Sequence, residues 1–269
     1  MKSLRKRRDL FRQRRIIRRF WLYVACGATL LSAPAYAAGT VGDARMDFEP
    51  RYGVDMPTAG VLHRGQYAFD AHMFRNGGLM LGVDVGIFDR MMIGLSYGGT
   101  NIIGIGSVQW QGAPGVTVKY RVIEESVLPA FTLGFESQGT EGYVSSANRF
   151  TIKSPGFYVA ASKNYAWFGF FSVHGCLNYS LESRDGKVPN LSASAEKSFG
   201  ENASVSVEYD FGLNDHNVTP QFGKDRGYLN LGVRWLVGGG LTVEADAKNI
   251  LGNEDGVPAG SRMVRIMYG

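Results

Sequence analysis

Apolar and polar residues alternate with a period of two along most of the chain after residue 65. In the segment 79–87 every odd-numbered residue is Leu, Val or Ile. In the segment 205–211 Val, Tyr and Phe alternate with Ser, Glu and Asp. Alternation of this length is typical of a β-strand with one apolar and one polar face. Helical periodicity is scarce, so the pattern predicts an all-β protein.

Twelve segments show this alternation, and most are close to the ~9–11 residues that a tilted strand needs to cross a bilayer. The predicted strands are 66–75, 79–89, 91–97, 115–122, 128–137, 156–163, 166–181, 189–199, 203–211, 228–236, 241–249 and 261–268. No run of 18 uninterrupted apolar residues follows Ala38, so the sequence predicts no transmembrane helix.

The apolar faces of these segments carry charged residues only near strand ends, as at Arg75, Lys163, Lys197 and Arg262. A face that meets lipid requires this, because a Lys or Arg at the bilayer midplane costs ~2–4 kcal/mol. The opposite faces mix Gly, Ser, Ala and charged residues, as the wall of a narrow polar lumen does. The two faces together predict strands that separate lipid from a hydrated interior.

The lengths of the connections alternate as well. If both ends of the chain lie in the periplasm, every second connection is periplasmic and short, and the others are extracellular and long. The expected periplasmic connections are all short: Arg90, 123–127, 164–165, 200–202 and 237–240. Four of the others are long (98–114, 138–155, 212–227 and 250–260), 182–188 is intermediate, and 76–78 is a short exception.

The sequence therefore predicts a transmembrane antiparallel up-and-down β-barrel of about 12 strands. A further strand within 101–109 or 151–155 keeps a range of 10–14 open. The expected domains are a periplasmic amino-terminal segment at 38–65 and the barrel at 66–269.

The first 37 residues have the order of a secretory signal peptide. They begin with a basic run from Lys2 to Arg19, continue with an apolar stretch to about Leu31, and end with Ala35-Tyr36-Ala37. An uncleaved membrane anchor is the alternative, but the apolar stretch is short for a membrane span. We expect export, cleavage before Ala38, and residence in the outer membrane.

This segment also explains the formal net charge of +5. Residues 1–37 hold 10 of the 29 Lys and Arg residues but one of the 24 acidic residues, so the remaining chain is acidic. A folded basic surface is not expected, and nucleic acid is excluded as a partner. After cleavage Cys176 is the one remaining cysteine, so neither an intrachain disulfide nor a Cys-based metal site is expected.

Eleven charged residues are expected to face the lumen, because they alternate with the apolar positions. They are Asp84, Lys119, Arg121, Glu136, Glu208, Asp210, Arg234, Glu244, Asp246, Lys248 and Arg265. Both signs occur, so pairing across a small lumen is the simpler interpretation. A path for a small solute or a glycan is the alternative.

Signals for catalysis and cofactors are weak. Ser172 and His174 share one strand face, but in the order opposite to the H-x-S pattern of barrel lipid hydrolases, and no third residue can be placed. His63, His72 and His216 show no metal-ligand spacing. We therefore expect no enzymatic activity, no cofactor and no metal.

Several segments resemble the YjbH-type outer-membrane proteins associated with bacterial exopolysaccharide production. The resemblance covers roughly residues 55–180. It rests on Asp55-Met56-Pro57-Thr58-Ala59, Val118-Lys119-Tyr120-Arg121, Leu128-Pro129-Ala130, Gly139-Thr140 and Tyr158-Val159-Ala160-Ala161-Ser162-Lys163. It implies an outer-membrane barrel linked to polysaccharide export, with polysaccharide or export components as partners, and it supplies no catalytic residues.

Other partners follow from the expected fold. The barrel would contact outer-membrane lipid. Val264, Ile266 and Tyr268 alternate up to the chain end, as in the terminal strand that the barrel-assembly machinery binds during insertion. The sequence thus favours a structural or transport-associated barrel. A barrel lipid hydrolase and a secreted soluble β-barrel that binds a ligand are the two alternatives.

The signal peptide leads to a first prediction. Because Ala35 and Ala37 supply the small residues that a signal peptidase requires, the mature protein should begin at Ala38. Amino-terminal sequencing of the membrane-inserted protein checks this. Retention of residues 1–37 on that protein would contradict it.

Overall fold

The structure is a computed structural model that describes residues 49–182, 188–215, 222–224, 226–254, 257 and 259–269. The expected signal peptide at 1–37 and the following residues 38–48 lie outside this described part. Within it, no helix is long and apolar enough to span a membrane.

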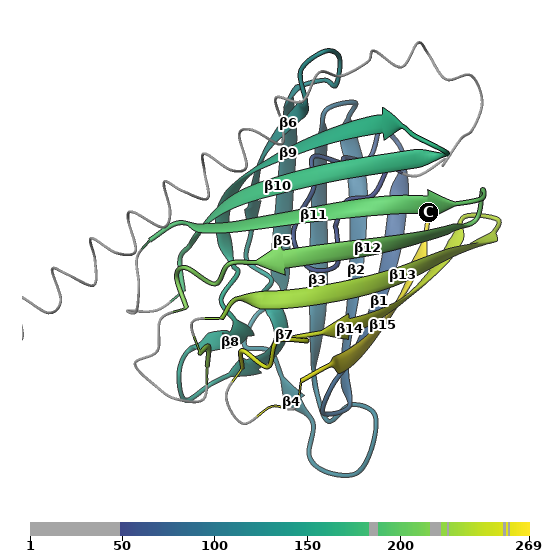
Figure 1. The fold of residues 1–269 in the computed structure, drawn as a ribbon. Helices are drawn as coiled ribbons and strands as arrows, with labels where there is room; N and C mark the ends of the chain where they lie inside the picture. Colours follow the sequence, from purple (N-terminus) through teal and green to yellow (C-terminus); the bar gives the residue numbers. More distant parts are fainter. Residues whose placement is uncertain (1–48, 183–187, 216–221, 225, 255–256, 258) are drawn as a thin grey trace, which may run out of the picture. The chain divides into compact units, whose positions relative to one another are not determined.

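Twelve antiparallel strands form a closed barrel (Figure 1). β1 pairs with β2 on one side and with β15 on the other, and this last pairing closes the ring. The barrel strands are β1 (Tyr67–Phe74), β2 (Gly78–Phe88), β3 (Met91–Thr100), β5 (Gly115–Ile123), β6 (Ala130–Glu136), β9 (Gly156–Ala166), β10 (Phe170–Ser180), β11 (Asn190–Phe199), β12 (Ala203–Asp210), β13 (Tyr228–Gly238), β14 (Leu241–Lys248) and β15 (Ser261–Tyr268). The predicted fold class is confirmed.

Three further strands lie in the connections. β4 (Gln109–Trp110) extends the pairing at the end of β3, and β7 (Thr140–Val144) pairs with β8 (Arg149–Ile152) in a separate hairpin. β4 includes residue 109 of the first region in which a further strand is possible, 101–109, and β8 includes residues 151 and 152 of the second, 151–155. Neither region contributes a strand that crosses the barrel, so the barrel has twelve strands.

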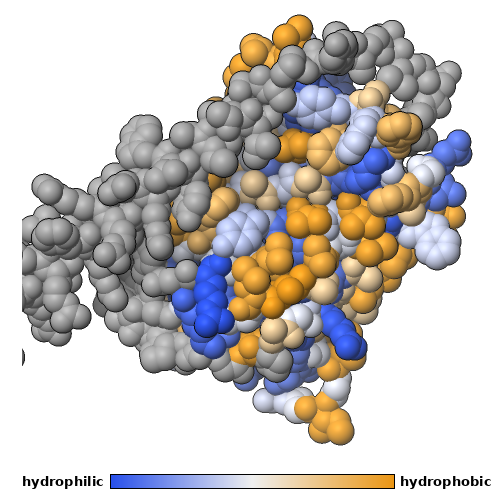
Figure 2. All heavy atoms as spheres, viewed as in Figure 1, coloured by the Kyte–Doolittle hydropathy of each residue, from blue (hydrophilic) through white to orange (hydrophobic). Residues whose placement is uncertain are grey.

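The apolar residues of the alternating pattern face the outside of the barrel, and the polar residues face the lumen. On β12, Val207 is 44% exposed whereas the adjacent Ser206 is 4% exposed. On β13, Leu231 is 40% exposed and Asn230 is 1% exposed. Figure 2 shows apolar residues gathered over the outer surface of the strands. A soluble barrel has the reverse arrangement, so these positions do not support the secreted soluble alternative.

Exposed aromatic side chains lie near both ends of the strands. They are Tyr67, Phe88, Trp167, Phe168, Phe199, Trp235 and Tyr268 at one end, and Tyr97, Trp110, Phe157 and Tyr179 at the other. Aromatic girdles of this kind mark the two interfaces of a membrane-spanning barrel. The apolar outer surface between them is the surface expected to meet lipid.

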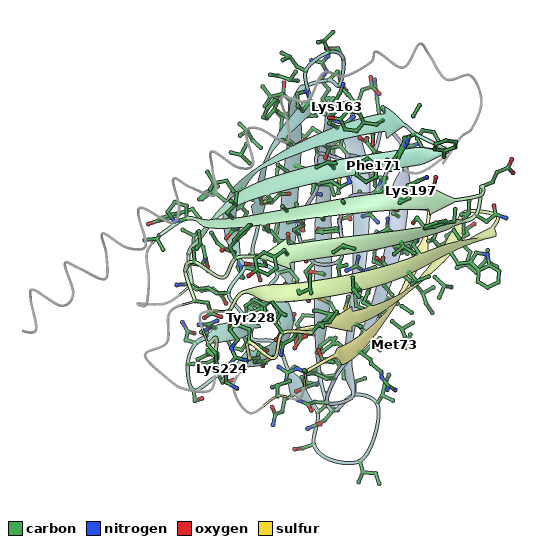
Figure 3. All side chains as sticks on the ribbon, viewed as in Figure 1. Met73, Lys163, Phe171, Lys197, Lys224 and Tyr228 are labelled. Carbon is green, nitrogen blue, oxygen red and sulfur yellow. The ribbon has the colours of Figure 1, made fainter. Side chains whose placement is uncertain are left out.

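The connections differ in length between the two ends of the barrel. At the short-turn end, strands are joined by 89–90, 124–129, 167–169, 200–202 and 239–240. At the long-loop end, they are joined by 75–77, 101–114, 137–155, 181–189, 211–227 and 249–260. Lys163 and Lys197 lie toward the short-turn end, and Lys224 and Tyr228 lie at the long-loop end (Figure 3). The first residue of β1 and the last residue of β15 both lie at the short-turn end.

Residues 49–62, which we call the lumenal segment, lie inside the barrel. The segment forms hydrogen bonds with Lys119 of β5, Ser162 of β9, Glu208 of β12 and Arg265 of β15. These strands are spaced around the whole ring. A segment can contact all of them only from within.

This placement differs from the periplasmic segment expected at 38–65. The expectation assumed that a stretch without strand alternation lies outside the barrel. Arg51 and the backbone groups of residues 53–59 instead bind charged side chains of the barrel wall, which need partners away from bulk water.

The two faces of β12 and β13 lead to a second prediction. Single cysteines at Val207 and Leu231, in a Cys176→Ser background, should react with a lipid-soluble thiol probe, because these positions face outward. Cysteines at Ser206 and Asn230 should not react, because they face the lumen. Equal labelling of both pairs would show that the lipid-facing assignment is wrong.

Charged substitutions test the same assignment independently. Val207→Arg or Leu231→Arg should impair insertion by ~2–4 kcal/mol. Ser206→Arg should be milder, because the polar lumen can solvate the new charge. The heat-modifiable mobility of the folded barrel on a gel measures the yield of inserted protein.

Candidate functional site

The lumenal segment is held by one carboxylate of the barrel wall. The Glu208 carboxylate accepts hydrogen bonds from three consecutive backbone amides: Val54 at 2.8 Å, Asp55 at 2.9 Å and Met56 at 2.9 Å. Consecutive amides that converge in this way form a concave anion site. Asn230 adds a side-chain hydrogen bond to the same carboxylate at 3.1 Å. These hydrogen bonds hold the segment beside Glu208 and so set its position along the barrel axis.

Gly53 makes this close approach possible. A Cβ atom at Gly53 would stand 2.8 Å from Oε2 of Glu208 and 3.0 Å from Oγ of Ser194. A side chain at this position would require the Glu208 carboxylate or the segment to shift. Glycine therefore favours the close packing against the carboxylate, and this effect does not come from its backbone dihedral angles.

Arg51 anchors the segment on the opposite side. Its guanidinium binds Asp70 of β1 at 2.9 Å and also forms an ion pair with Asp84 of β2. The Arg51 side chain is 1% exposed. The two carboxylates compensate the positive charge of the guanidinium, whose burial without a partner would be costly.

The basic residues of the wall bind carbonyl oxygens of the segment. Lys119 donates to the Arg51 carbonyl at 2.6 Å, Arg121 donates to the Ala59 carbonyl at 2.8 Å, and Arg265 donates to the Val54 carbonyl at 2.7 Å. Hydrogen bonds to a charged group contribute about 1.5–3 kcal/mol each. The segment therefore supplies backbone partners to both the acidic and the basic side chains of the lumen.

A row of ion pairs crosses the wall from β11 to β15. Arg234 binds Glu196 at 3.2 Å and Glu244 at 3.1 Å, and Arg265 binds Glu244 at 3.4 Å. Arg234 also donates to the Gly53 carbonyl at 3.2 Å. The row connects four strands with the lumenal segment.

All eleven charged residues expected to face the lumen lie on the inner side of their strands. The structure brings them into three kinds of environment. Some bind the lumenal segment, some pair with each other, and Glu136, Asp210 and Asp246 form no ion pair with a described residue.

Sequence reasoning missed the charged partners that lie outside the barrel strands. Arg51 and Asp55 belong to the segment expected in the periplasm, and Glu141 belongs to the expected loop 138–155. Asp55 pairs with Lys248 at 2.8 Å, and Glu141 pairs with the same lysine at 3.2 Å. One signal was available, since the motif Asp55–Ala59 precedes the first strand and carries the family resemblance.

The connections at the long-loop end pack against one another over the lumen. Arg75 binds Glu141 at 2.5 Å and also binds Glu254, while Arg149 binds Asp215 at 2.7 Å. Burial raises the pKa of Glu254 to about 7, although Arg75 acts in the opposite direction. Burial alone would also raise the pKa of Glu141, but Lys248 and Arg75 together hold it below its ordinary value.

Two hollows lie on either side of the lumenal segment. The chamber, of about 120 Å³, lies toward the long-loop end between Tyr52, Met56 and the residues Gln138–Glu141. The vestibule, of about 170 Å³, opens at the short-turn end between Pro50, Ser204 and Gly238–Gly240. Tyr52 of the segment and Arg265 of β15 line both hollows, and the segment lies between the two hollows.

The part of the chain that the structure describes contains no group of three or more His, Cys, Asp or Glu residues placed to hold a metal ion. Nδ1 of His174 lies 2.8 Å from Oγ of Ser162, whereas Ser172 donates to Asn164 at 2.6 Å. Ser172 and His174, which share a strand face, therefore have different hydrogen-bond partners. His216 lies outside the described residues.

No protein-family model and no curated protein matches the sequence. Among solved structures, the chain is similar to a KdgM porin, with a TM-score of 0.49 and 12% identity over 76% of this chain and 98% of that chain. It is also similar to a NanC porin, with a TM-score of 0.41 and 10% identity over 75% of this chain and 98% of that chain. Similarity at this level gives no information on a shared ligand.

A third prediction follows from Glu182 at the long-loop end. Burial raises its pKa to about 7, although it accepts hydrogen bonds from the amides of Phe150 at 2.7 Å and Ser154 at 3.2 Å. A carboxyl group with a raised pKa stabilises the folded state below its ordinary value of 4.5, and this contribution is lost as the pH rises through about 7.

The hydrogen-exchange protection factors of these two amides measure the effect. They should fall roughly tenfold between pH 5 and pH 8, after discounting for partial exposure. Glu182→Gln keeps an acceptor without the titration, so protection in this variant should stay level. Equal protection of the original protein at both pH values would refute the assignment.

Proposed function

We propose that this chain is a transport-associated outer-membrane barrel, in which the lumenal segment controls the passage of small polar solutes. The observation that carries the proposal is the position of residues 50–57 across a lumen whose wall is polar. With the segment in place, the chamber and the vestibule are separate. With the segment withdrawn, they would form one hydrated path.

The way in which the segment is held supports this proposal. Its described residues form no strand with the barrel and contain only one isolated bridge, between Tyr52 and Pro57. Most of its bonds to the wall join charged side chains to backbone groups or to Arg51 and Asp55, and Ser162 and Thr132 add bonds from neutral hydroxyl groups. Water can replace such partners at modest net cost. Withdrawal would also expose the side chains of Met56, Val61 and Leu62, which pack against apolar wall residues, and this burial favours the closed position.

The proposal extends to exopolysaccharide production through the resemblance to YjbH-type proteins. The motif Asp55–Ala59 belongs to the lumenal segment, where Ala59 donates its amide hydrogen to Ser162 and its carbonyl accepts from Arg121. A motif in the segment that divides the lumen supports a role in passage. On this proposal, polysaccharide or export components are the partners, and the barrel-assembly machinery acts during insertion.

We propose further that the chain is not a lipid hydrolase. Oγ of Ser162 lies near His174 but also accepts the amide hydrogen of Ala59, so the lumenal segment covers it. Nε2 of His174 has no hydrogen-bond partner among the described residues, and a triad needs a carboxylate there. Phospholipid turnover by the purified protein that is lost in Ser162→Ala or Ser172→Ala would overturn this.

A fourth prediction tests control by the lumenal segment. In planar bilayers, the mature chain should show low and intermittent conductance, and a variant lacking residues 38–62 should conduct steadily. Glu208→Ala removes the acceptor of three amides, and each buried unpaired group costs about 1–3 kcal/mol. The fraction of time that this variant conducts should rise roughly tenfold or more.

Val207→Ala, on the outer face of the same strand, is the matched control and should leave conductance unchanged. Heat-modifiable mobility identifies variants that remain folded. If the folded deletion variant conducts no better than the mature chain, the segment does not control passage and the proposal fails.

A further inference from the structure

We infer that the chamber is a binding site for a small polar solute that is neutral or cationic and rich in hydrogen-bond donors. This inference deepens the proposed function, because it names the class of solute that the lumen accepts. It rests on three features of the chamber: buried polar atoms without a partner, an excess of carboxylates, and a volume suited to a small molecule.

Tyr158 provides the first feature. It is 3% exposed and lines the chamber, yet its hydroxyl has no hydrogen-bond partner among the described residues. Its ring lies against Gly134 on β6, where an added Cβ would come within 2.1 Å of the ring. Gly134 therefore leaves space for the Tyr158 ring, and the Tyr158 hydroxyl remains available to another partner. Buried hydroxyls without a partner are rare in folded proteins.

Asn178 adds a second such atom to the same wall. Its amide nitrogen donates to the Ser154 carbonyl at 2.9 Å, but its Oδ1 atom is buried without a described donor. An acceptor without a donor and a hydroxyl without a partner thus line one hollow. A solute with hydroxyl or amine groups can satisfy both.

The charges of the wall determine which solutes fit. Seven Asp and Glu side chains line the chamber, against three Lys and Arg side chains. Most of these carboxylates are bound by Arg51, Lys248 or the amides at Glu208. Glu136 and Asp210 form no ion pair with a described residue.

These two carboxylates keep acceptor capacity toward the chamber. Asp210 accepts from Asn190 and from the Gly212 amide through Oδ1 alone, both at 2.7 Å. Glu136 accepts from Tyr52 through Oε1 at 3.4 Å. An anionic solute would meet these carboxylates unfavourably, whereas an ammonium or hydroxyl group would be bound.

The volume and the aromatic rings fit the same class. A hollow of about 120 Å³ has room for roughly ten water-sized groups, because each needs ~10–15 Å³ of such volume. Tyr52, Tyr158 and Tyr228 are among the residues that line the chamber. A compact polyhydroxylated molecule presents both C–H faces and hydroxyl groups to such a surface.

Three probes of similar size and different charge test the inference: glucosamine, glucose and glucuronate. Saturation-transfer NMR titrations with the folded mature chain in detergent should give the affinity order glucosamine, then glucose, then glucuronate. Tyr158→Phe removes one hydroxyl and should weaken glucose binding by roughly three- to tenfold. Glu136→Gln combined with Asp210→Asn should reduce the preference for glucosamine over glucuronate by roughly tenfold.

Tyr179→Phe is the matched control, because Tyr179 lies on the outer face of β10 and is 42% exposed. It should bind the probes as the original protein does. Binding of glucuronate at least as tight as that of glucosamine would overturn the inference, and so would the absence of binding by all three probes. Conductance of the variant lacking residues 38–62 would still test the proposed function, so the two failures are distinguishable.

Discussion

The structure depends on one constraint, which is that backbone N–H and C=O groups facing hydrocarbon must be paired within the protein. The pairing of β1 with β15 meets it, because it removes the two free edges of the sheet. Closure then sets the direction of every side chain. Alternate residues face lipid or a lumen, so Val207 and Leu231 lie outside while Glu208 and Asn230 lie inside.

A closed barrel of twelve strands creates a second requirement. Its inner wall collects charged side chains that are largely removed from bulk water, and such charges need partners. The row from Glu196 to Arg265 meets part of this need within the wall. The lumenal segment meets much of the rest, since its amides bind Glu208 and its carbonyls bind Lys119 and Arg121.

The same contacts join the two ends of the lumen. Lys248 bridges Asp55 of the lumenal segment and Glu141 of the β7–β8 hairpin, and Glu141 also binds Arg75. Lys248 therefore contacts both the lumenal segment and the β7–β8 hairpin, which line the chamber. Withdrawal of the segment would leave Lys248 with Glu141 alone, so movements at the two positions are expected to be coupled. A solute in the chamber would meet both surfaces at once.

The sequence by itself determined the barrel, its apolar outer face and the inward direction of eleven charged residues. These properties are local: a period of two assigns each side chain to a face, and the length of a strand relates it to a bilayer. Predicting the alternation of loop lengths required only the order of the strands. Only the tertiary structure decided which charges meet and where residues 49–62 lie. Glu208 finds its donors more than 150 positions earlier in the chain, and Arg51 finds Asp70 and Asp84 on two strands. Periodicity carries no information about such contacts, because they depend on the width of the closed lumen and on the space that Gly53 leaves beside Glu208.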